Sequence, residues 1–495
     1  MLLSFILRLL DLYVFSSPAG LQSSHTSIVR DPTCMRIQNE ISSSSNVYYF
    51  GHPLYFKGIS HWASSSSEIS NCVVEPGTPQ DVAIVLQIVG STRTPFAVKG
   101  GGHTANAGFS STTGVHISMY RFSEVEYDPE RQTAKIGAGL LWDDVYAKLE
   151  PYNVNVVGGR VTGVGVAGFI LGGGYSWKTN QYGLTIDTVV AFELVTPTGA
   201  IINVTHESEP ELFFALKGSQ NNFGIVTKFT LKTFPQTEVW GGILYYPALS
   251  LKAVGAATIE FHAKVKDPKA SIIVTFGTLL KVPLAIAILF YDAPQPPPGI
   301  FDEFLRLQSF RKDVKTRTFS SLVKASPSNT TSSQRGMLDT VPMLDITPSI
   351  MNAIVNEALT VGSTLTLTTD TFFSFSVEPF LPNLYNHSVL PSAFPWTRSQ
   401  PYMPFNLYAS WLLPTSDNIM RSAIQKSAKR IRRLAIKEGQ DIRPDAPKYV
   451  NYAPKGTDIR MVFGPQENIE RLSAVKRVFD PKDVMGLAGG FKIPV

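Results

Sequence analysis

The sequence predicts an α+β protein with more than one domain. Its 495 residues, 44% of them hydrophobic, can bury more than one core at the usual size of roughly 100–200 residues per domain. Up to about residue 237 short strand-like runs and tight turns are dense, whereas apolar strands alternate with longer helical segments beyond residue 238. This change indicates a domain boundary near residue 238.

The first domain is expected to open with a helix between two strands. Cys72-Val73-Val74 is strand-like, and residues 95–98 form a second apolar run. Between them Thr78 is a helix N-cap and Pro79 takes the first helical position, where proline is favoured. The apolar stripe of this helix is Val82, Val85, Leu86 and Val89. The Ser-rich segment before residue 68 is expected to be irregular.

The other elements follow from periodicity and turn signals. In the first domain we expect strands at 115–119 and 133–139, a helix at 141–150, a hairpin of 189–196 with 200–204, a helix at 212–217 and a strand at 224–234. In the second we expect strands at 241–246, 271–278 and 283–291, helices at 249–265 and 301–307, strands with proline-rich loops to residue 413, and a basic helix at 417–438. A helix at 467–479 closes the chain.

Charge and metal-ligand patterns exclude several classes of function. The 44 Lys and Arg residues against 39 Asp and Glu give a net charge of +5 without a dense basic block, so no nucleic-acid partner is expected. The eight histidines lack metal-ligand spacing, and two cysteines are too few for a cysteine-rich metal module. No metal is expected.

Residues 1–20 resemble a secretory signal peptide. Their apolar run is interrupted by Arg8 and Asp11 and is too short to span a bilayer, so no membrane association is expected. Glycosylation sequons at Asn203, Asn329 and Asn386 agree with this interpretation. We therefore expect a protein that is secreted or belongs to the secretory pathway.

Two glycine-rich loops bracket one histidine. The first is Lys99-Gly100-Gly101-Gly102-His103-Thr104; the second is Gly163-Val164-Gly165-Val166-Ala167-Gly168, followed by Gly172-Gly173-Gly174-Tyr175. Glycines persist where a backbone approaches a ligand closely, and consecutive free N–H groups suit phosphate or pyrophosphate. The second loop matches the pattern G-x-G-x-x-G, but the following glycine triplet would break the helix that a Rossmann site requires. A large phosphorylated cofactor in another fold is predicted.

These loops belong to a series of six motifs. The others are residues 181–184 (Gln-Tyr-Gly-Leu), 213–218 (Phe-Phe-Ala-Leu-Lys-Gly), 222–227 (Asn-Phe-Gly-Ile-Val-Thr) and the C-terminal helix around 468–476 with Asp480-Pro481. Together they resemble the berberine bridge enzyme-like flavoproteins with a PCMH-type FAD domain, and residues 489–494 resemble the fungal branch. The resemblance implies a two-subdomain FAD-binding domain over residues 21–237, completed by residues 441–495. It also implies a central antiparallel-sheet substrate domain, covered by helices, over residues 238–440.

The resemblance implies the cofactor and its attachment as well. The family carries FAD joined covalently to the histidine of the Gly-Gly-His motif, here His103, whose neutral imidazole is a competent nucleophile. Val161 occupies the position of a second, cysteine link, so a single attachment is implied, and the two cysteines match a family disulfide, Cys34–Cys72. The implied FAD-binding residues are Lys99, Gly100, Gly101, Gly102, His103, Thr104, Gly163, Val164, Gly165, Gly168, Gly172, Gly173, Gly224, Ile225 and Val226.

In this family a base takes a proton from a hydroxyl or amine while a hydride passes from the substrate carbon to the flavin. By resemblance the candidate catalytic residues are Tyr175, Tyr449, Asn451 and Tyr452, with a packing role under the flavin as the alternative for Tyr175. A tyrosine base at neutral pH needs its pKa lowered by a cation or by hydrogen bonds. Val164 matches a position whose small side chain leaves room for O2, which favours an oxidase.

The resulting hypothesis is an FAD-dependent oxidase that acts on a small organic substrate in fungal secondary metabolism, with O2 as electron acceptor. One alternative is a secreted oligosaccharide oxidase, for which Trp396 and Trp411 are candidate sugar platforms. Two others are a redox-neutral, flavin-assisted cyclase or isomerase and a non-catalytic binding protein with the same fold.

Overall fold

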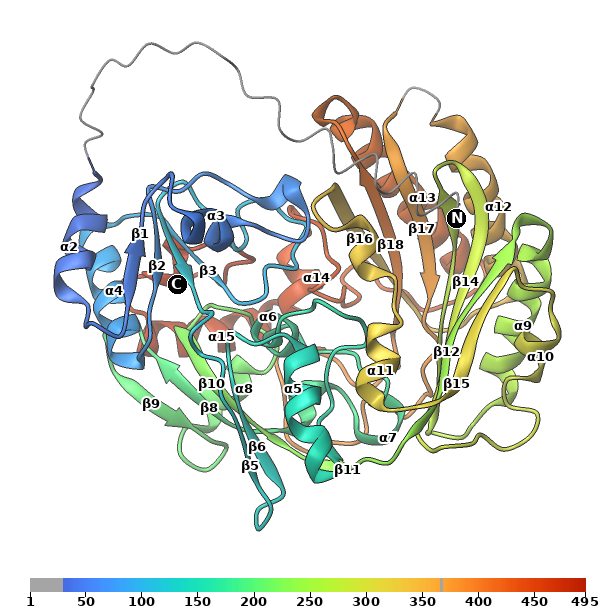
Figure 1. Ribbon diagram of the computed structural model, residues 1–495, viewed down its shortest axis with the longest axis horizontal. Coiled ribbons are helices and arrows are strands. Elements are labelled where there is room, and N and C mark those ends of the chain that lie inside the picture. Colours follow the sequence, from blue (N-terminus) through green and yellow to red (C-terminus); the bar gives the residue numbers. More distant parts are fainter. Residues whose placement is uncertain (1–29, 366–367) are drawn as a thin grey trace.

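The computed structural model describes residues 30–365 and 368–495, so the expected signal peptide over residues 1–20 lies outside the described residues. Figure 1 shows two parts side by side. The part on the left holds a four-stranded and a five-stranded sheet, and the part on the right is built on one seven-stranded sheet. Helices pack on the sheets of both parts, so the predicted α+β class is confirmed.

The four-stranded sheet has the order β1-β2-β4-β3, with β1 antiparallel to β2 and with β2 and β3 parallel to β4. Its strands are β1 (Asn46–Tyr48), β2 (Cys72–Glu75), β3 (Phe96–Lys99) and β4 (Val115–Ser118). Helix α4 (Pro79–Thr92) connects β2 to β3. It begins as expected, because Thr78 Oγ1 accepts a hydrogen bond from the Asp81 N–H at 3.1 Å.

The segment before residue 68, expected to be irregular, contains two helices. These are α2 (Pro32–Glu40) and α3 (Pro53–Ile59), each with proline in the first turn. The Asp31 carboxylate caps α2 by accepting a hydrogen bond from the Cys34 N–H at 3.0 Å. A disulfide between Cys34 and Cys72 joins α2 to β2, as the resemblance implies.

The five-stranded sheet is antiparallel, in the order β5-β6-β10-β8-β9. Its strands are β5 (Val125–Asp128), β6 (Thr133–Gly137), β10 (Ile225–Lys232), β8 (Val189–Val195) and β9 (Ile201–Val204); nearby lie the pair β7 (Val154–Asn155) and β11 (Phe234–Pro235) and the helices α5 (Trp142–Leu149), α6 (Val166–Leu171), α7 (Thr179–Tyr182) and α8 (Pro210–Leu216). Strands β8 and β9 form the expected hairpin. Helix α6 is a short helix inside the second glycine loop, and it ends directly before the glycine triplet, which breaks it as expected.

The seven-stranded antiparallel sheet has the order β15-β12-β14-β13-β17-β18-β16. Its strands are β12 (Val239–Pro247), β13 (Ala270–Leu279), β14 (Val282–Tyr291), β15 (Arg311–Arg317), β16 (Arg335–Met343), β17 (Asp370–Val377) and β18 (Met403–Trp411). Helices α9 (Leu251–Lys264), α12 (Pro348–Thr364) and α13 (Asp417–Lys437) cover its outer face, and α10 (Asp302–Arg306) and α11 (Phe319–Lys324) lie in the connections (Figure 1). The sequence analysis missed α12. The opposite face of the sheet looks toward the first part.

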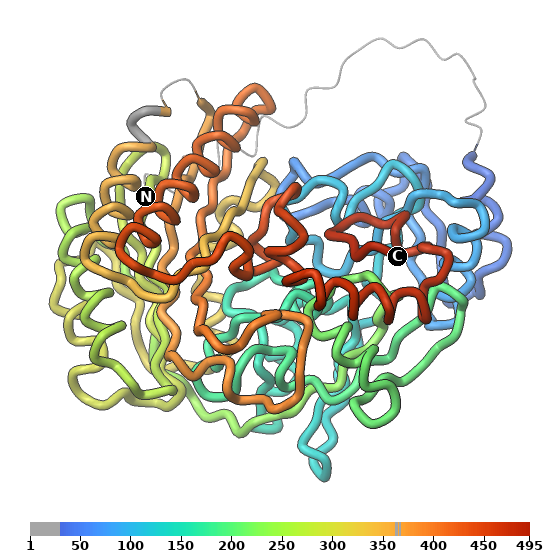
Figure 2. Tube along the Cα trace, turned by 180° about the vertical axis from the view of Figure 1, so that it is seen from behind, coloured from blue at the N-terminus to red at the C-terminus, as the bar shows by residue number. Residues whose placement is uncertain are grey.

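The C-terminal segment returns to the first part. After α14 (Ile459–Phe463), helix α15 (Gln466–Phe479) packs on α8, and the last residues run back along the first part (Figure 2). The buried Asn222 side chain anchors them: its Nδ2 donates to the carbonyl of Phe491 at 3.0 Å, and its Oδ1 accepts from the N–H of Ile493 at 3.1 Å. Asn222, from the motif at residues 222–227, thus fixes the C-terminal end of the chain.

We expect Asn222→Ala to lower the free energy of unfolding by about 3 kcal/mol, because it leaves a buried carbonyl and a buried N–H without their partner. Chemical denaturation followed by fluorescence measures this change. The exposed Asn383→Ala is the matched control and should stay within about 0.5 kcal/mol of the parent protein. Equal stability of the two variants would contradict the anchoring role.

Candidate active site

A cavity of about 1460 Å³ lies between the two parts of the molecule. On one side it is bounded by what we call the glycine-rich wall, formed by residues 100–104, by Val164, Gly165, Ala167 and Gly168, and by residues 224–226. The other side is the strand face, formed by the inward side chains of β12, β13, β14, β17 and β18. The C-terminal residues 449–452 close one end. This volume is large enough for a cofactor and a small substrate together.

The two glycine loops are in backbone contact with each other. A Cβ added to Gly101 would lie 2.5 Å from the Gly165 Cα, and one added to Gly165 would lie 2.5 Å from the Gly101 nitrogen. Any side chain at either position would separate the loops. By contrast, a Cβ at Gly168 would meet nothing within 4 Å. The missing side chains of Gly101 and Gly165 therefore let the two loops touch, and the missing side chain of Gly168 leaves free space at the wall. Both features suit the binding of a large flat cofactor.

Most of the predicted FAD-binding residues line the cavity. They are Gly100, Gly101, Gly102, His103, Thr104, Val164, Gly165, Gly168, Gly224, Ile225 and Val226. Lys99, Gly163, Gly172 and Gly173 do not. Lys99 is the last residue of β3, and its Nζ points away from the cavity, where it donates hydrogen bonds to the carbonyl of Gly58 and to the Tyr120 hydroxyl, both at 2.7 Å. These contacts favour a structural role for Lys99 over the predicted role as a cofactor ligand.

The three other glycines outside the lining make room for neighbouring chain segments. A Cβ on Gly172 would lie 2.2 Å from Asn451 Oδ1, and one on Gly173, whose φ is +113°, would lie 2.7 Å from the Phe394 ring. A Cβ on Gly163, at φ +86°, would lie 3.0 Å from Asn329 Oδ1. The absence of side chains at these glycines lets Asn451, Phe394 and Asn329 pack directly against them.

His103 presents its imidazole in the state that a nucleophile needs. The ring stacks on the Trp62 indole with centroids 4.4 Å apart and planes at 13°. Its Nε2 is shielded from solvent and has no hydrogen-bond partner among the described residues. Burial lowers the pKa of His103 to about 4, because the imidazolium loses hydration. The neutral ring thus keeps a free lone pair, and the nearby position 161 carries a valine that offers no second nucleophile.

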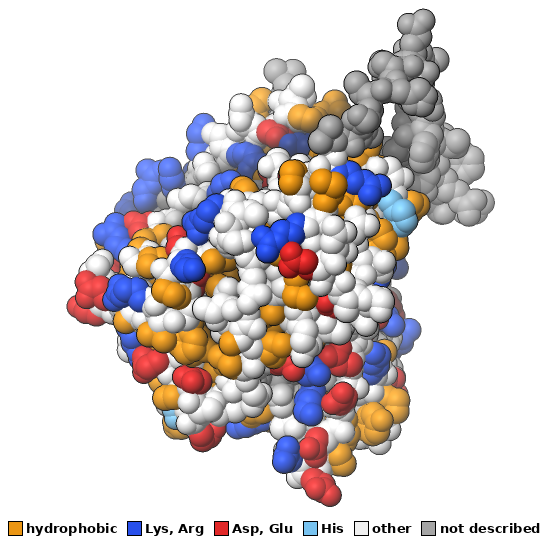
Figure 3. Space-filling model, turned by 90° about the vertical axis from the view of Figure 1, so that its left-hand side faces the viewer, with side chains coloured by type: hydrophobic (Ala, Val, Ile, Leu, Met, Phe, Trp, Pro, Cys, Tyr) orange, Lys and Arg blue, Asp and Glu red, His pale blue; other side chains and the backbone are white. Residues whose placement is uncertain are grey.

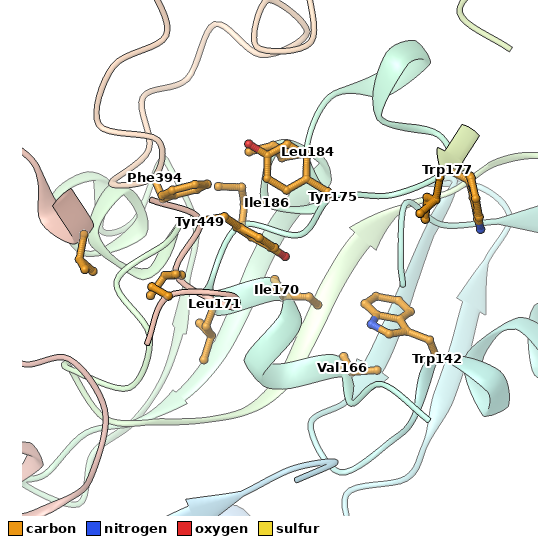
Figure 4. Packing of buried hydrophobic residues seen from close by; sticks show 14 of the residues in the cluster. Trp142, Val166, Ile170, Leu171, Tyr175, Trp177, Leu184, Ile186, Phe394 and Tyr449 are labelled. Atoms are coloured by element: carbon orange, nitrogen blue, oxygen red, sulfur yellow. The ribbon is translucent and has the colours of Figure 1, made fainter. Parts of the chain in front are cut away.

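Tyr175 lies behind the cavity. Figure 4 shows it next to Tyr449, and the two rings meet edge to face at 4.7 Å. The Tyr175 hydroxyl is hydrogen-bonded to that of Tyr385 at 2.7 Å. Burial raises the pKa of Tyr175 well above its ordinary value, which is opposite to what a base requires. These contacts favour the packing role over the catalytic role.

The other three predicted catalytic residues line the cavity. Asn451 Nδ2 donates to the Tyr449 hydroxyl at 2.9 Å and to the Phe169 carbonyl at 3.2 Å, so it joins the C-terminal segment to α6. Burial raises the pKa of Tyr449 to about 12. Tyr449 is therefore a neutral hydrogen-bonding group at physiological pH.

A buried ion pair that was not expected from the sequence lies at the cavity. Arg160 Nη2 donates to Glu378 Oε2 at 2.5 Å, with side-chain exposures of 6% and 2%. Arg160 also donates to the Tyr452 hydroxyl at 3.1 Å, and that hydroxyl donates to Glu378 Oε1 at 3.3 Å. The three side chains come from three distant segments and all line the cavity. No local pattern around Glu378 could have shown this triad.

Burial sets the proton affinity of the triad. It raises the pKa of Glu378, and the Arg160 guanidinium opposes that rise by stabilising the carboxylate. Burial also raises the pKa of Tyr452. Glu378 is thus a carboxylate with more affinity for a proton than an exposed one, beside a hydroxyl that can relay the proton.

In the part of the chain that the structure describes, neither a metal-ligand cluster nor a membrane-spanning helix is found. Within residues 30–365 and 368–495 there is no group of three or more His, Cys, Asp or Glu side chains placed to hold a metal ion. Over the same ranges no helix is both long and apolar enough to cross a membrane. Figure 3 shows charged side chains of both signs interspersed over the end of the first part.

Comparison with known proteins identifies the cofactor class. A family model described as an FAD binding domain matches residues 70–205. An uncharacterized FAD-linked oxidoreductase from Arthroderma benhamiae is 31% identical, covering 88% of this chain and 89% of the relative. An FAD-dependent monooxygenase from Fusarium proliferatum is also 31% identical, covering 93% and 94%. The fold, the site and these relatives define an FAD-linked oxidoreductase.

Solved structures share the whole fold at low identity. The 6-hydroxy-D-nicotine oxidase from Arthrobacter nicotinovorans matches with a TM-score of 0.73 at 18% identity, covering 92% of this chain and 98% of that one. A berberine bridge enzyme-like protein from Physcomitrella patens matches with a TM-score of 0.74 at 17% identity, covering 91% and 97%. A carbohydrate oxidase from Microdochium nivale gives 0.74 at 17%, covering 92% and 99%. These structures show the fold that this chain shares with a berberine bridge enzyme-like protein and with two oxidases. The fungal relatives show the family, and the chain belongs to the FAD-linked oxidoreductases.

For Tyr175→Phe we expect unchanged turnover and flavin content, with a loss of about 1 kcal/mol in the free energy of unfolding from the missing hydrogen bond. The Tyr385 hydroxyl keeps the Tyr402 carbonyl as its acceptor at 2.6 Å, so no buried group is left unpaired. Steady-state kinetics and thermal denaturation measure the two effects. A large fall in kcat with flavin retained would restore the catalytic role of Tyr175.

Proposed function

We propose that the protein is an oxidase that uses covalently bound FAD to oxidise an alcohol or amine carbon of a small organic substrate. The observation that carries this proposal is the buried Glu378 carboxylate with Arg160 and Tyr452, which faces the same cavity as the glycine-rich wall and His103. FAD held by the glycine-rich wall would supply the acceptor for the substrate hydride, with O2 as the final electron acceptor. The chain itself must supply the base and the substrate site.

Glu378 takes the proton in this scheme. As the substrate carbon loses its hydride, the proton of its hydroxyl or amine passes to Glu378, either directly or through the Tyr452 hydroxyl, which already donates to Oε1. Arg160 holds the other carboxylate oxygen and keeps Glu378 ionised between turnovers. Removal of either partner would leave a buried charge unpaired, so the pair acts as one unit.

Covalent attachment is supported by the state of His103. Attack on an electrophilic ring methyl group needs an unprotonated nitrogen, and the stacked, neutral imidazole provides one. Trp62 fixes the ring plane, and its own Nε1 donates to the Ser328 carbonyl at 3.2 Å. Trp62 is therefore a positioning residue for His103.

O2 is the proposed acceptor, supported by Val164 at the wall and by solved relatives that are named oxidases. A monooxygenase is the second candidate, because several relatives of similar identity bear that name. An oxidase releases one H2O2 for each substrate oxidised, whereas a monooxygenase transfers an oxygen atom from labelled O2 to the product. Product formation without O2 uptake would instead indicate the redox-neutral alternative.

We further propose that the protein enters the secretory pathway and acts in fungal secondary metabolism. The disulfide supports an oxidising compartment. The three sequon asparagines, Asn203, Asn329 and Asn386, are all exposed, so each is open to glycosylation. Detection of N-glycans on protein from a fungal host, with an N-terminus beyond residue 20, tests this placement.

Glu378→Gln should lower the rate of anaerobic flavin reduction by about 10²- to 10⁴-fold while flavin content stays unchanged, because an amide cannot accept the proton. In the parent enzyme this rate should fall as pH drops through the pKa of Glu378, and burial places that fall at a higher pH than for an ordinary carboxyl group. Stopped-flow absorbance measures both. The exposed Glu126→Gln is the control; equal rates in the two variants would exclude Glu378 as the base.

His103→Ala should release all flavin into the supernatant when the protein is precipitated with acid, whereas the parent protein should keep its yellow colour in the pellet. Covalent incorporation into apoprotein should still proceed at pH 5.5, where a free histidine is mostly protonated, and should fail only as the pH approaches 4, because the pKa of His103 is lowered to about 4. Colour retained by the His103→Ala pellet would overturn this attachment site.

A further inference from the structure

The strand face changes from polar to apolar from one strand to the next. One row of directly paired residues crosses five strands: Asn406 on β18, Ser376 on β17, Thr275 on β13, Ile286 on β14 and Tyr245 on β12. All five side chains line the cavity. Thr275 and Ser376 share a hydrogen bond at 2.9 Å. The end of the row on β18 and β17 therefore carries hydrogen-bonding side chains. The end on β14 and β12 carries an aliphatic and an aromatic side chain.

The side chains around Ile286 extend the apolar end into a lobe. We call apolar lobe the part of the cavity lined by Tyr245, Pro247, Ala248, Ile273, Leu279, Leu280, Val282, Leu284, Ile286, Ile288 and Phe310. Among these side chains only that of Tyr245 carries a polar group, and the Arg311 guanidinium, which also lines the cavity, lies over the Tyr245 ring at 5.5 Å. At its outer end Leu280, Val282 and Phe310 are 56%, 63% and 64% exposed. Exposed apolar side chains gathered at a cavity mouth mark a place where an apolar ligand enters.

The turn at this mouth departs from the usual turn chemistry. Leu280 and Lys281 form the two-residue connection of the β13–β14 hairpin, with φ values of +48° and +66°. Such turns favour Asn and Gly, because a side chain like leucine is strained at positive φ. Burial does not offset this strain, because the Leu280 side chain is 56% exposed. A strained, exposed leucine at the rim of a cavity is best explained by contact with a ligand.

The polar end of the row adjoins the catalytic triad. Ser376 and Glu378 are two residues apart and both line the cavity, so they lie on the same side of the chain. Asn406 Oδ1 has no hydrogen-bond partner among the described residues. A buried amide oxygen without a partner is costly in a folded protein. It is available to a donor group of a substrate whose reacting carbon lies near Glu378.

We propose that the substrate is an elongated amphipathic molecule. Its hydrogen-bonding, reacting end lies over Ser376, Asn406 and Glu378, and its apolar body crosses Thr275 and Ile286 to leave at the Leu280 turn. This inference rests on the function proposed above and names the substrate class for the same cavity. From β17 to β12 the row spans three strand spacings, roughly 14 Å, which a single small ring cannot cover.

The same geometry argues against an oligosaccharide. Sugar rings need hydrogen-bonding groups along their whole length, whereas at the apolar lobe these are confined to Tyr245 and the adjoining Arg311. Neither candidate sugar platform lines the cavity. The Trp411 Nε1 donates to the Asp417 carboxylate at 2.7 Å in a fully buried position, and the Trp396 ring lies under the Arg443 guanidinium at 5.1 Å.

The test is calorimetric titration of the holoenzyme with para-alkylbenzyl alcohols whose chains lengthen from methyl to octyl, with xylobiose as the sugar probe. Each methylene group that enters the lobe should tighten Kd about fourfold, with an increasingly negative heat-capacity change. A Kd that is independent of chain length, or xylobiose binding as tight as that of the octyl probe, would overturn the inference. Binding is read without turnover, so a chain-length dependence without H2O2 release would support the lobe while rejecting the oxidase.

Two variants locate the effect. Ile286→Asn should weaken the octyl probe at least tenfold and leave the methyl probe unchanged. Leu280→Asn should weaken the long probes alone, and it should fold, because asparagine tolerates positive φ. Val478→Asn replaces an exposed apolar residue on α15 outside the cavity and is the control. Equal affinities of all three variants for the octyl probe would place the apolar body elsewhere and overturn the proposal.

Discussion

The buried ion pair between Arg160 and Glu378 is the interaction on which the active site depends. Transfer of two charges out of water costs several kcal/mol for each ion unless they meet in good geometry, so the pair forms only when its two segments are correctly placed. Arg160 belongs to the first part and Glu378 follows β17 of the second, and Tyr452 from the returning C-terminal segment bonds to both. The pair therefore couples the relative position of the two parts to the presence of a base in the cavity.

The glycine contacts provide the complementary constraint. Because Gly101 and Gly165 touch through their backbones, the two loops of the glycine-rich wall meet without an intervening side chain, and His103 lies two residues after this contact. Helix α6 leaves this wall and buries Val166 and Ile170 in the core shown in Figure 4. The loop is thus held by apolar packing on its core side, while its cavity side carries only glycines and the small side chains of Val164 and Ala167. A surface of small residues beside a neutral histidine suits the covalent attachment of a flat ring system.

The features that the sequence predicted correctly are those with a local signature. Turn glycines, a proline-initiated helix and a Gly-Gly-His segment can each be recognised from a few neighbouring residues. The resemblance to a known family supplied the order of these motifs. Glu378 has no such signature, since its partner Arg160 lies 218 residues away along the chain. Lys99 shows the reverse error: it adjoins the glycine loop in sequence, but its side chain points to the opposite side of the strand end. Helix α12 was missed although Thr347 and Pro348 begin it in the usual way.

The fold separates the chemistry from the choice of substrate. The reacting groups come from the wall, the end of β17 and the C-terminal segment, whereas β12, β13 and β14 contribute only side chains that contact the rest of the substrate. In an antiparallel sheet each of these strands presents every second residue to the cavity, and its alternate residues pack against α9 and α12. A substitution on the cavity side therefore changes the substrate surface without disturbing the helical layer. Because no residue of the apolar lobe belongs to the triad or to the glycine-rich wall, the substrate surface of this fold can change while the cofactor site stays the same.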